Sequence, residues 1–118
     1  NTPLQIAFSK IIPASAEYSR KFCAEMEKRR NFLTEKATEW GFDPIKSAGS
    51  YFFMATFDRI SDLDDMKFME YMIREKQVAL IPASPFYLNA MDEGKRLVRF
   101  NFVKSMEALE KAAENMRR

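Results

Sequence analysis

The stretch RLVRFNFVKS, Arg96 to Ser105, decides how the fold is interpreted, because its alternating side chains predict a strand with two different faces. Successive side chains of a strand point to opposite sides of the sheet. The face that is rich in phenylalanine is typical of a core covered by helices, and the other face places Arg99 beside Asn101. The two faces are Val98, Phe100 and Phe102, and Leu97, Arg99, Asn101 and Val103.

Arg99 admits two interpretations. A guanidinium group is a planar fork of donors that can bind both oxygens of a carboxylate, and Asn101 could assist it. Alternatively, Arg99 could be an ordinary surface arginine on the exposed face of a strand. The alternation by itself favours the ordinary surface arginine over a carboxylate site.

Further strands are predicted on the N-terminal side of this stretch. The run from Tyr51 to Phe57 is too short and too aromatic for a helix, and because both of its alternating faces are apolar we expect a strand buried on both sides. The segment VALI, Val78 to Ile81, predicts a short strand that Pro82 stops. A loop is expected over residues 83–95.

Helices are predicted around these strands. One is expected over residues 2–13, where Pro13 ends it, and a second, long one over residues 15–40. Ser61 and Ser105 are expected to cap two more helices. The inner stripe of the helix after Ser61 is predicted to be Leu63, Met66, Met69 and Ile73. This order predicts an α+β fold, a small mixed or antiparallel sheet covered by helices, with one long helix in the N-terminal half.

Length and composition bound the class of protein. The 118 residues predict a single domain, residues 1–118. A net charge of +2 argues against a nucleic-acid or membrane partner, and the sequence contains no bilayer-length apolar run and no secretory signal at its start. We therefore expect a soluble, intracellular protein of undetermined compartment. The sequence has no histidine, the commonest general base and metal ligand, and a single cysteine.

Other features could carry chemistry, and each has a simpler explanation. Lys10 could form a Schiff base, but its place on the outer face of an amphipathic helix favours a solvated lysine. The acidic residues Asp62, Asp64 and Asp65 lack the spacing of a calcium loop and suit the start of a helix, so no metal site is predicted. Gly49 fits a turn, or a backbone that another group approaches closely.

Two features suggest partners. The loop IPASPFY, Ile81 to Tyr87, contains two prolines and two aromatic residues, and it is interpreted equally well as the lining of a site or as a surface loop. The 11 Phe and 8 Met residues are many for a domain of this size. We therefore expect apolar surface that faces a partner.

Together these segments resemble the C-terminal small domain of the class I/II aminotransferases, fold-type I enzymes that depend on pyridoxal phosphate (PLP). The resemblance covers essentially the whole chain. Its blocks, in order, are TPLQIA, EKRRNFLTEKATEWGF, SAGSYFFMATF, VALIPASPFY and LVRFNFVKSMEALEKA. The last two are most similar to the kynurenine aminotransferase and glutamine transaminase branch, which overlaps with the cysteine-conjugate β-lyases.

The resemblance assigns roles to particular residues. Arg99 occupies the place of the family arginine that binds the substrate α-carboxylate, which reverses the preference drawn from the alternation alone. The resemblance also implies that two short segments lie near the substrate entrance. They are Gly49, Ser50 and Tyr51, and Ser84, Phe86 and Tyr87.

The family's Schiff-base lysine, phosphate-binding loop and pyridine-nitrogen partner have no matching block here, and Lys10 lacks the motif of that lysine. The resemblance therefore implies that these 118 residues hold no catalytic or cofactor-binding residue, that the large PLP domain is missing, and that the chain alone is inactive. The complete enzyme would use PLP, exchange an amino acid with a 2-oxo acid, and form a homodimer. The alternatives are a stand-alone module that binds small carboxylates, and the small domain of a fold-type I β-lyase or decarboxylase.

Overall fold

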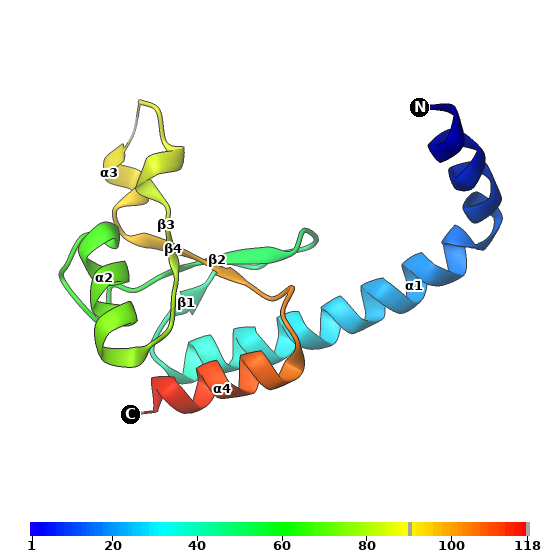
Figure 1. Ribbon diagram of the computed structural model, residues 1–118. Helices are drawn as coiled ribbons and strands as arrows, with labels where there is room; N and C mark the ends of the chain where they lie inside the picture. Colours follow the sequence, from blue (N-terminus) through cyan, green and yellow to red (C-terminus); the bar gives the residue numbers. More distant parts are fainter. Residues whose placement is uncertain (90, 118) are drawn as a thin grey trace.

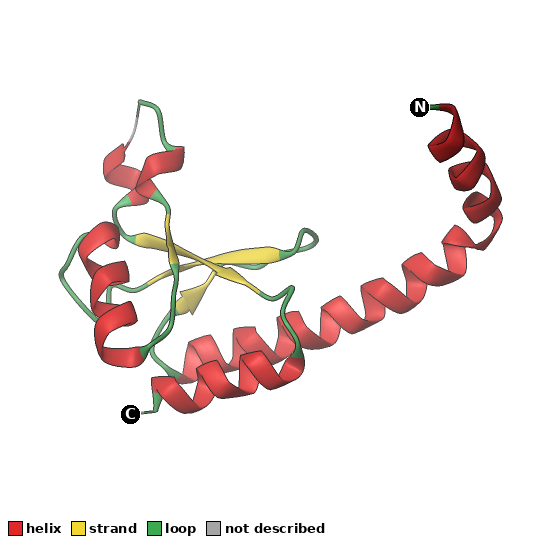
Figure 2. Ribbon diagram, viewed as in Figure 1, coloured by secondary structure: helices red, strands yellow, loops and turns green. Residues whose placement is uncertain are grey.

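The computed structural model describes residues 1–89 and 91–117 and contains a long helix, a four-stranded sheet and shorter helices (Figure 1). Figure 2 shows the sheet with α1 and α4 lying along one side of it. The elements in chain order are α1 (Thr2–Glu39), β1 (Asp43–Pro44), β2 (Phe52–Thr56), α2 (Asp65–Lys76), β3 (Ile81–Pro82), the 3₁₀ helix η1 (Ser84–Phe86), α3 (Met91–Gly94), β4 (Leu97–Asn101) and α4 (Met106–Met116). The predicted α+β class with a small sheet is confirmed.

The sheet has the order β1-β2-β4-β3, and every neighbouring pair is antiparallel. The central pair is β2 with β4, in a register that places Met54 opposite Arg99. On the other side of β4, Ile81 of β3 also lies opposite Arg99. Because directly opposed residues share a face of an antiparallel sheet, these three side chains lie on one face.

The opposite face of the sheet forms the core. The buried side chains of β4 are Val98 and Phe100, and Phe102 continues the same face, as the alternation predicts. Phe100 stacks on Phe53 of β2 with ring centroids 5.1 Å apart. Burying a side chain of this size stabilises the fold by roughly 1.5–3 kcal/mol. The helices contribute Leu33, Ala37, Phe68, Met72 and Leu109 to the same core.

The prediction that β2 is buried on both sides is wrong. Phe53 and Ala55 are buried, whereas Phe52, Met54 and Thr56 are half-buried. An antiparallel sheet can cover one face with helices and leave the other face partly open to water. The face that carries Arg99 is this partly open one.

The prediction that Pro13 ends a first helix is also wrong, because α1 is a single helix that contains Pro13. Proline has no N–H to donate to the carbonyl four residues earlier, so it kinks a helix where neighbouring hydrogen bonds persist. Figure 1 shows the change of direction in the blue part of α1. The Ser15 hydroxyl does not cap a new helix and instead donates to the Ile12 carbonyl at 2.6 Å.

The start and the inner face of α2 differ from the prediction. Asp64, not Ser61, is the N-cap, and its carboxylate accepts a hydrogen bond from the Lys67 N–H at 2.8 Å. The predicted inner residues Leu63, Met66 and Ile73 are exposed. The buried residues of α2 are Asp65, Phe68 and Met72. Both stripes have helical spacing, but Phe68 stacks on Phe57 with ring centroids 4.1 Å apart, so the face with the large aromatic ring turns inward.

The segment before β4 is more structured than a loop. The strand β3 comprises Ile81 and Pro82 rather than residues 78–81. Pro82 is thus the last residue of the strand and not the residue that follows it. A proline is tolerated there because β3 is an edge strand. Residues 83–95 then contain η1 and α3. The predicted Ser105 cap of α4 is confirmed, since its hydroxyl accepts from the Ala108 N–H at 3.2 Å.

Candidate functional site

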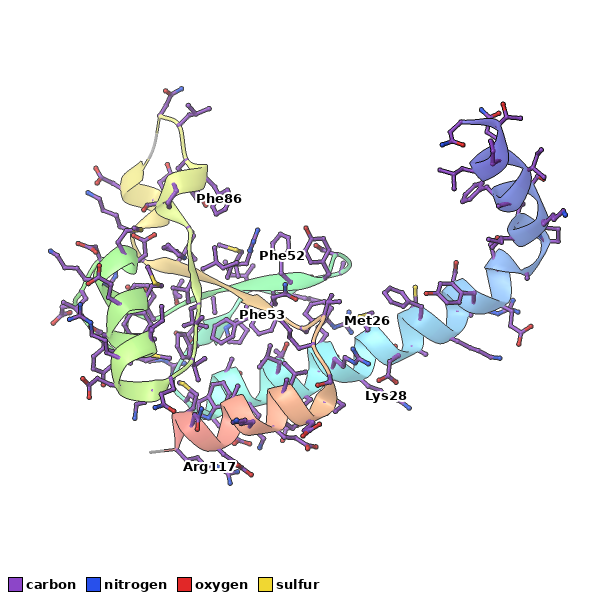
Figure 3. The ribbon with its side chains drawn as sticks, in the orientation of Figure 1. Met26, Lys28, Phe52, Phe53, Phe86 and Arg117 are labelled. Carbon is purple, nitrogen blue, oxygen red and sulfur yellow. The ribbon has the colours of Figure 1, made fainter. Side chains whose placement is uncertain are left out.

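Arg99 lies at the middle of β4 on the open face of the sheet, where two aromatic rings contact it. The guanidinium carbon Cζ is 4.8 Å from the ring centroid of Phe52 and 5.3 Å from that of Phe86. Figure 3 shows Phe52 and Phe86 on the same side of the sheet, and Phe53 pointing to the other side, toward α1. Cation–π contacts of this kind attract a guanidinium to the ring faces and favour one position for it.

Arg99 has a buried donor without a partner among the described residues. Within residues 1–89 and 91–117, its buried Nε has no hydrogen-bond partner, and Arg99 forms no ion pair. Arg96, three residues earlier, is the opposite case, because it bonds the Asp58 carboxylate at 2.5 Å and the carbonyls of Leu63 and Ser61 at 2.7 Å. Arg96 therefore has hydrogen-bond partners within the chain, whereas the Nε of Arg99 has none among the described residues.

An unsatisfied buried donor has a free-energy cost of about 1–3 kcal/mol. A hydrogen bond from Arg99 to an acceptor outside the described residues would remove this cost. A guanidinium binds a planar anion such as a carboxylate through two parallel hydrogen bonds. Asn101 lies beside Arg99 on the same face, but its side-chain oxygen accepts from the Val103 N–H at 2.8 Å. The arrangement can bind a carboxylate through Arg99, between two aromatic rings.

The position of Phe86 depends on η1 and on two residues that contact it. The buried carboxylate of Asp65 accepts a hydrogen bond from the Ser84 N–H at 2.7 Å. A Cβ atom on Gly94 would lie 2.6 Å from Ser84 Cα and 2.9 Å from the Tyr87 ring, so only glycine lets α3 approach η1 this closely. Of the three loop residues that the sequence singles out, Phe86 contacts Arg99, whereas Ser84 is buried and the Tyr87 ring lies close to Gly94.

Gly49, Ser50 and Tyr51 lie at the beginning of β2. Gly49 and Ser50 line a cavity of about 520 Å³ between this turn and α1, and no described contact joins them to Arg99. A Cβ atom on Gly49 would meet nothing within 4 Å, and Ser50 has a left-handed φ of 71°. Tyr51 is exposed, and its ring packs edge-on against Phe52 with centroids 5.4 Å apart. Tyr51 is thus the member of this segment that reaches the Arg99 site, through Phe52.

A second cavity, of about 370 Å³, is lined by α1, α4 and residues 77–81 and also touches Arg99. Its walls include Leu80, Phe100 and Leu109, which belong to the hydrophobic core. Polar residues line it as well, among them Asn101 and Lys104.

Asp64 and Asp65 stand at the start of α2, and Lys10 stands in the first half of α1. In the part of the chain that the structure describes, no three His, Cys, Asp or Glu side chains are grouped as metal ligands. Asp64 is a helix cap and Asp65 turns into the core. Lys10 is exposed, in the half of α1 that Figure 1 shows far from the sheet. None of the helices in residues 1–89 and 91–117 combines the length and apolarity needed to cross a membrane.

Three contributors were not identified from the sequence: Phe52, Asp65 and Gly94. Phe52 was assigned only to a strand, and its contact with Arg99 depends on the pairing of β2 with β4. Asp65 was assigned to a helix start, although its spacing of three and seven residues from Phe68 and Met72 places it on the buried face. Nothing in the local sequence marks Gly94, because its role is a close approach between two segments.

Comparison with known proteins identifies the class. The sequence profile of the family "Aminotransferase class I and II" matches residues 1–116. The chain therefore belongs to the class I and II aminotransferase family, as its motifs indicate. Full-length enzymes of this family use PLP.

Individual relatives agree with this assignment. The methionine aminotransferase of Escherichia coli (strain K12) is 29% identical over 117 residues, which is 99% of this chain and 30% of that protein. Kynurenine–oxoglutarate transaminase 3 of Mus musculus is 29% identical over 133 residues, 98% of this chain and 29% of that protein. The crystal structure of YbdL from Escherichia coli, described as a methionine aminotransferase, superposes with a TM-score of 0.88 at 29% identity, covering 99% of this chain and 30% of that one. The chain thus spans about 30% of the length of these relatives.

Proposed function

We propose that residues 1–118 act as the small domain of a PLP-dependent amino-acid aminotransferase, in which Arg99 binds the α-carboxylate of the substrate. One observation carries the proposal. The guanidinium of Arg99 is held between Phe52 and Phe86 while its buried Nε lacks a partner among the described residues. A site that already bears the cost of burying an unpaired donor gains most from an anion that pairs with it.

The two rings give the contact its precision. Phe52 belongs to the central strand β2 and Phe86 to η1, so the guanidinium is clamped between two different elements. Their apolar surfaces cover part of the guanidinium, and an ion pair with a carboxylate is stronger where less water surrounds it. A substrate fixed at its carboxylate has its remaining bonds oriented relative to the rest of the site, and such positioning accounts for much of the rate in group-transfer enzymes.

The described residues around Arg99 do not fit the role of holding PLP. The rings and strand neighbours that contact or face Arg99 are Phe52, Phe86, Met54 and Ile81, and the nearby Asn101 amide oxygen already accepts from the Val103 N–H. In the proposed enzyme the cofactor, which supplies the electron sink for amino-group transfer, is held by a large domain outside these 118 residues. We accordingly expect the 118 residues alone to be inactive, and the complete enzyme to work as a homodimer.

The first half of α1 supports the proposal of a covering domain. Leu4, Phe8 and Ile12 are each more than half exposed on a helix that extends away from the sheet (Figure 1). Exposed apolar side chains in such number mark a surface that is covered in the working protein.

For the substrate we propose an amino acid of the kynurenine and glutamine type with a 2-oxo acid as acceptor. The similarity to a kynurenine–oxoglutarate transaminase supports this choice. The similarity to a methionine aminotransferase makes methionine a second donor to measure. The aromatic and aliphatic surroundings of Arg99 suit donors whose side chains are not charged.

The test compares an acid with its amide in the full-length enzyme. L-Methionine and L-methioninamide differ only in the carboxylate that Arg99 is proposed to bind. We expect Arg99→Ala to lower kcat/KM for L-methionine by about 150-fold, the equivalent of roughly 3 kcal/mol for a paired charged contact, and to leave the value for the amide nearly unchanged. The same variant should lower kcat/KM for L-kynurenine and L-glutamine with 2-oxoglutarate as acceptor.

Arg96→Ala is the matched control. It removes an arginine whose partners all lie within the chain, so we expect a lower Tm and an unchanged ratio of acid to amide. If Arg99→Ala preserved the preference for the acid, Arg99 would not be the carboxylate contact.

A further inference from the structure

We propose that Asp65 is a positioning residue of this site: its buried carboxylate holds η1 so that Phe86 stays against Arg99. The proposal rests on the function proposed for Arg99, because it assigns the residue that keeps one wall of that site in place. Asp65 does not contact Arg99, and it acts through Ser84 and Phe86.

Asp65 is an unusual carboxylate for a helix start. It is 1% exposed, and it shares the inner face of α2 with Phe68 and Met72. The neighbouring Asp64 already caps the helix through Lys67, so Asp65 is not needed as a cap. A buried carboxylate is costly unless hydrogen bonds compensate it, and Asp65 accepts one from the Ser84 N–H at 2.7 Å.

The bond from Ser84 fixes a short and stiff segment. The turn of η1 is closed by the Phe86 N–H donating to the Ala83 carbonyl at 3.0 Å and by the Tyr87 N–H donating to the Ser84 carbonyl at 3.1 Å. Pro85 between them has a restricted φ. An anchor at the first residue of η1 therefore determines where Phe86, its last residue, is placed.

Phe86 cannot hold itself in place by burial. Its side chain is 66% exposed, so its packing contributes little to fixing it. Ala83, the N-cap of η1, is attached to β4, because its N–H donates to the Leu97 carbonyl at 3.2 Å. The bond to Asp65 is the next attachment along the chain, and it holds Ser84, the first residue of η1.

The experiment uses the full-length enzyme and measures hydrogen exchange and kinetics on the same variants. Asp65→Ala removes the acceptor of the Ser84 N–H. We expect the amides of Ser84, Phe86 and Tyr87 to exchange at least about tenfold faster, while those of β2 and β4 keep their wild-type rates. We also expect KM for L-methionine to rise about tenfold with kcat changed less than about threefold, because a loosened wall weakens substrate binding.

Two further variants separate positioning from general stability. Asp64→Ala removes the N-cap of the same helix one residue away and should leave both the exchange of residues 84–87 and KM unchanged. Asp65→Asn keeps the shape and an oxygen acceptor but loses the charge, so it should loosen residues 84–87 less than Asp65→Ala and more than Asp64→Ala, and it remains informative if Asp65→Ala does not fold. Greater loosening of residues 84–87 in Asp65→Asn than in Asp64→Ala would then support the proposal.

The outcomes distinguish this inference from the proposed function. Equal effects of the Asp64 and Asp65 variants, or faster exchange throughout the core, would overturn the positioning role. Faster exchange at residues 84–87 with an unchanged KM would also overturn it, because Phe86 would then not matter to the site. If Arg99→Ala left the acid-to-amide preference intact, the proposed function would fail, whatever the exchange of η1 showed.

Discussion

At the scale of single residues, Arg96 and Arg99 show how the surroundings of a side chain decide its role. Arg96 connects parts of this chain, whereas Arg99 has a donor that lacks a partner among the described residues. Arg96 contacts the Phe57 ring at 4.8 Å and has three hydrogen-bond partners, so it connects β4 to the segment before α2. Arg99 also contacts rings, but the described residues give its Nε no acceptor. Arg96 therefore stabilises the fold, and the unpaired donor of Arg99 is suited to bind an anion from outside the described residues.

Gly94 provides a prediction about stability at the same scale. A methyl group there would approach the backbone of Ser84 to 2.6 Å, and a backbone cannot move aside as a flexible side chain can. We expect Gly94→Ala to lower the free energy of unfolding by about 1–3 kcal/mol, the usual cost of overpacking. Denaturant unfolding of the variant and the wild type measures the difference.

Gly49→Ala is the matched control, since a Cβ atom at Gly49 meets nothing within 4 Å. Its free energy of unfolding should stay within about 0.5 kcal/mol of the wild type. Equal stability of the two variants would mean that η1 and α3 do not pack as closely as the structure shows.

At the scale of elements, α2 divides two adjacent acidic residues between different tasks. Asp64 caps the helix from outside, and Asp65 turns inward to hold η1. Asp64 is the extended N-cap, whereas Asp65 is the first residue of the helix, so the two carboxylates point in different directions. The segment from α2 to α3 therefore supports one wall of the Arg99 site through a residue that is remote from it in sequence.

The cap of α2 predicts a pH dependence. The hydrogen bond from the Lys67 backbone N–H holds the pKa of Asp64 below its ordinary value of 3.8. A carboxyl group whose pKa is lowered by folding stabilises the fold above pH 3.8, and this contribution is lost as the pH falls through the lower folded value. We expect the Tm of the wild type to fall more steeply below pH 3.8 than that of Asp64→Asn, which caps without titrating.

Differential scanning calorimetry of both proteins over a series of pH values would measure this. Only the difference between the two curves is informative, because other carboxyl groups titrate equally in both proteins. Parallel curves below pH 3.8 would show that the Asp64 carboxylate does not contribute as a charged cap.

At the scale of the whole molecule, α1 belongs to two environments. Its second half packs on the sheet through Leu33 and Ala37, while its first half extends beyond the sheet with apolar side chains exposed (Figure 1). Pro13 lies in that first half, where the helix changes direction. In the proposed enzyme the large domain covers these residues.

This arrangement predicts that the 118 residues, studied alone, self-associate through the first half of α1. We expect the mass measured by analytical ultracentrifugation to rise with concentration, because exposed apolar surface is buried when chains associate. The double variant Phe8→Glu with Ile12→Glu should lower this association. Met66→Glu with Ile73→Glu, which changes exposed apolar residues of α2, should leave it unchanged.

The sequence alone determined the elements that depend on local pattern. The alternation around Arg99 predicted which side chains of β4 enter the core, and the cap at Ser105 predicted the start of α4 correctly. Its errors lie where two local patterns were equally good, as on the two apolar stripes of α2, or where a single residue was given too much weight, as at Pro13. Burial against neighbouring elements decides such cases, and burial is not a local property.

The motifs were sufficient to identify the family, and with it the place where Arg99 is expected to act. Only the tertiary structure decided what surrounds Arg99, because Phe52 comes from a strand 47 positions earlier in the chain and Phe86 from a turn that Asp65 holds. The contact of these rings with the guanidinium depends on strand register and on close packing at Gly94. Both are relations between distant segments, which a local pattern of residues does not contain.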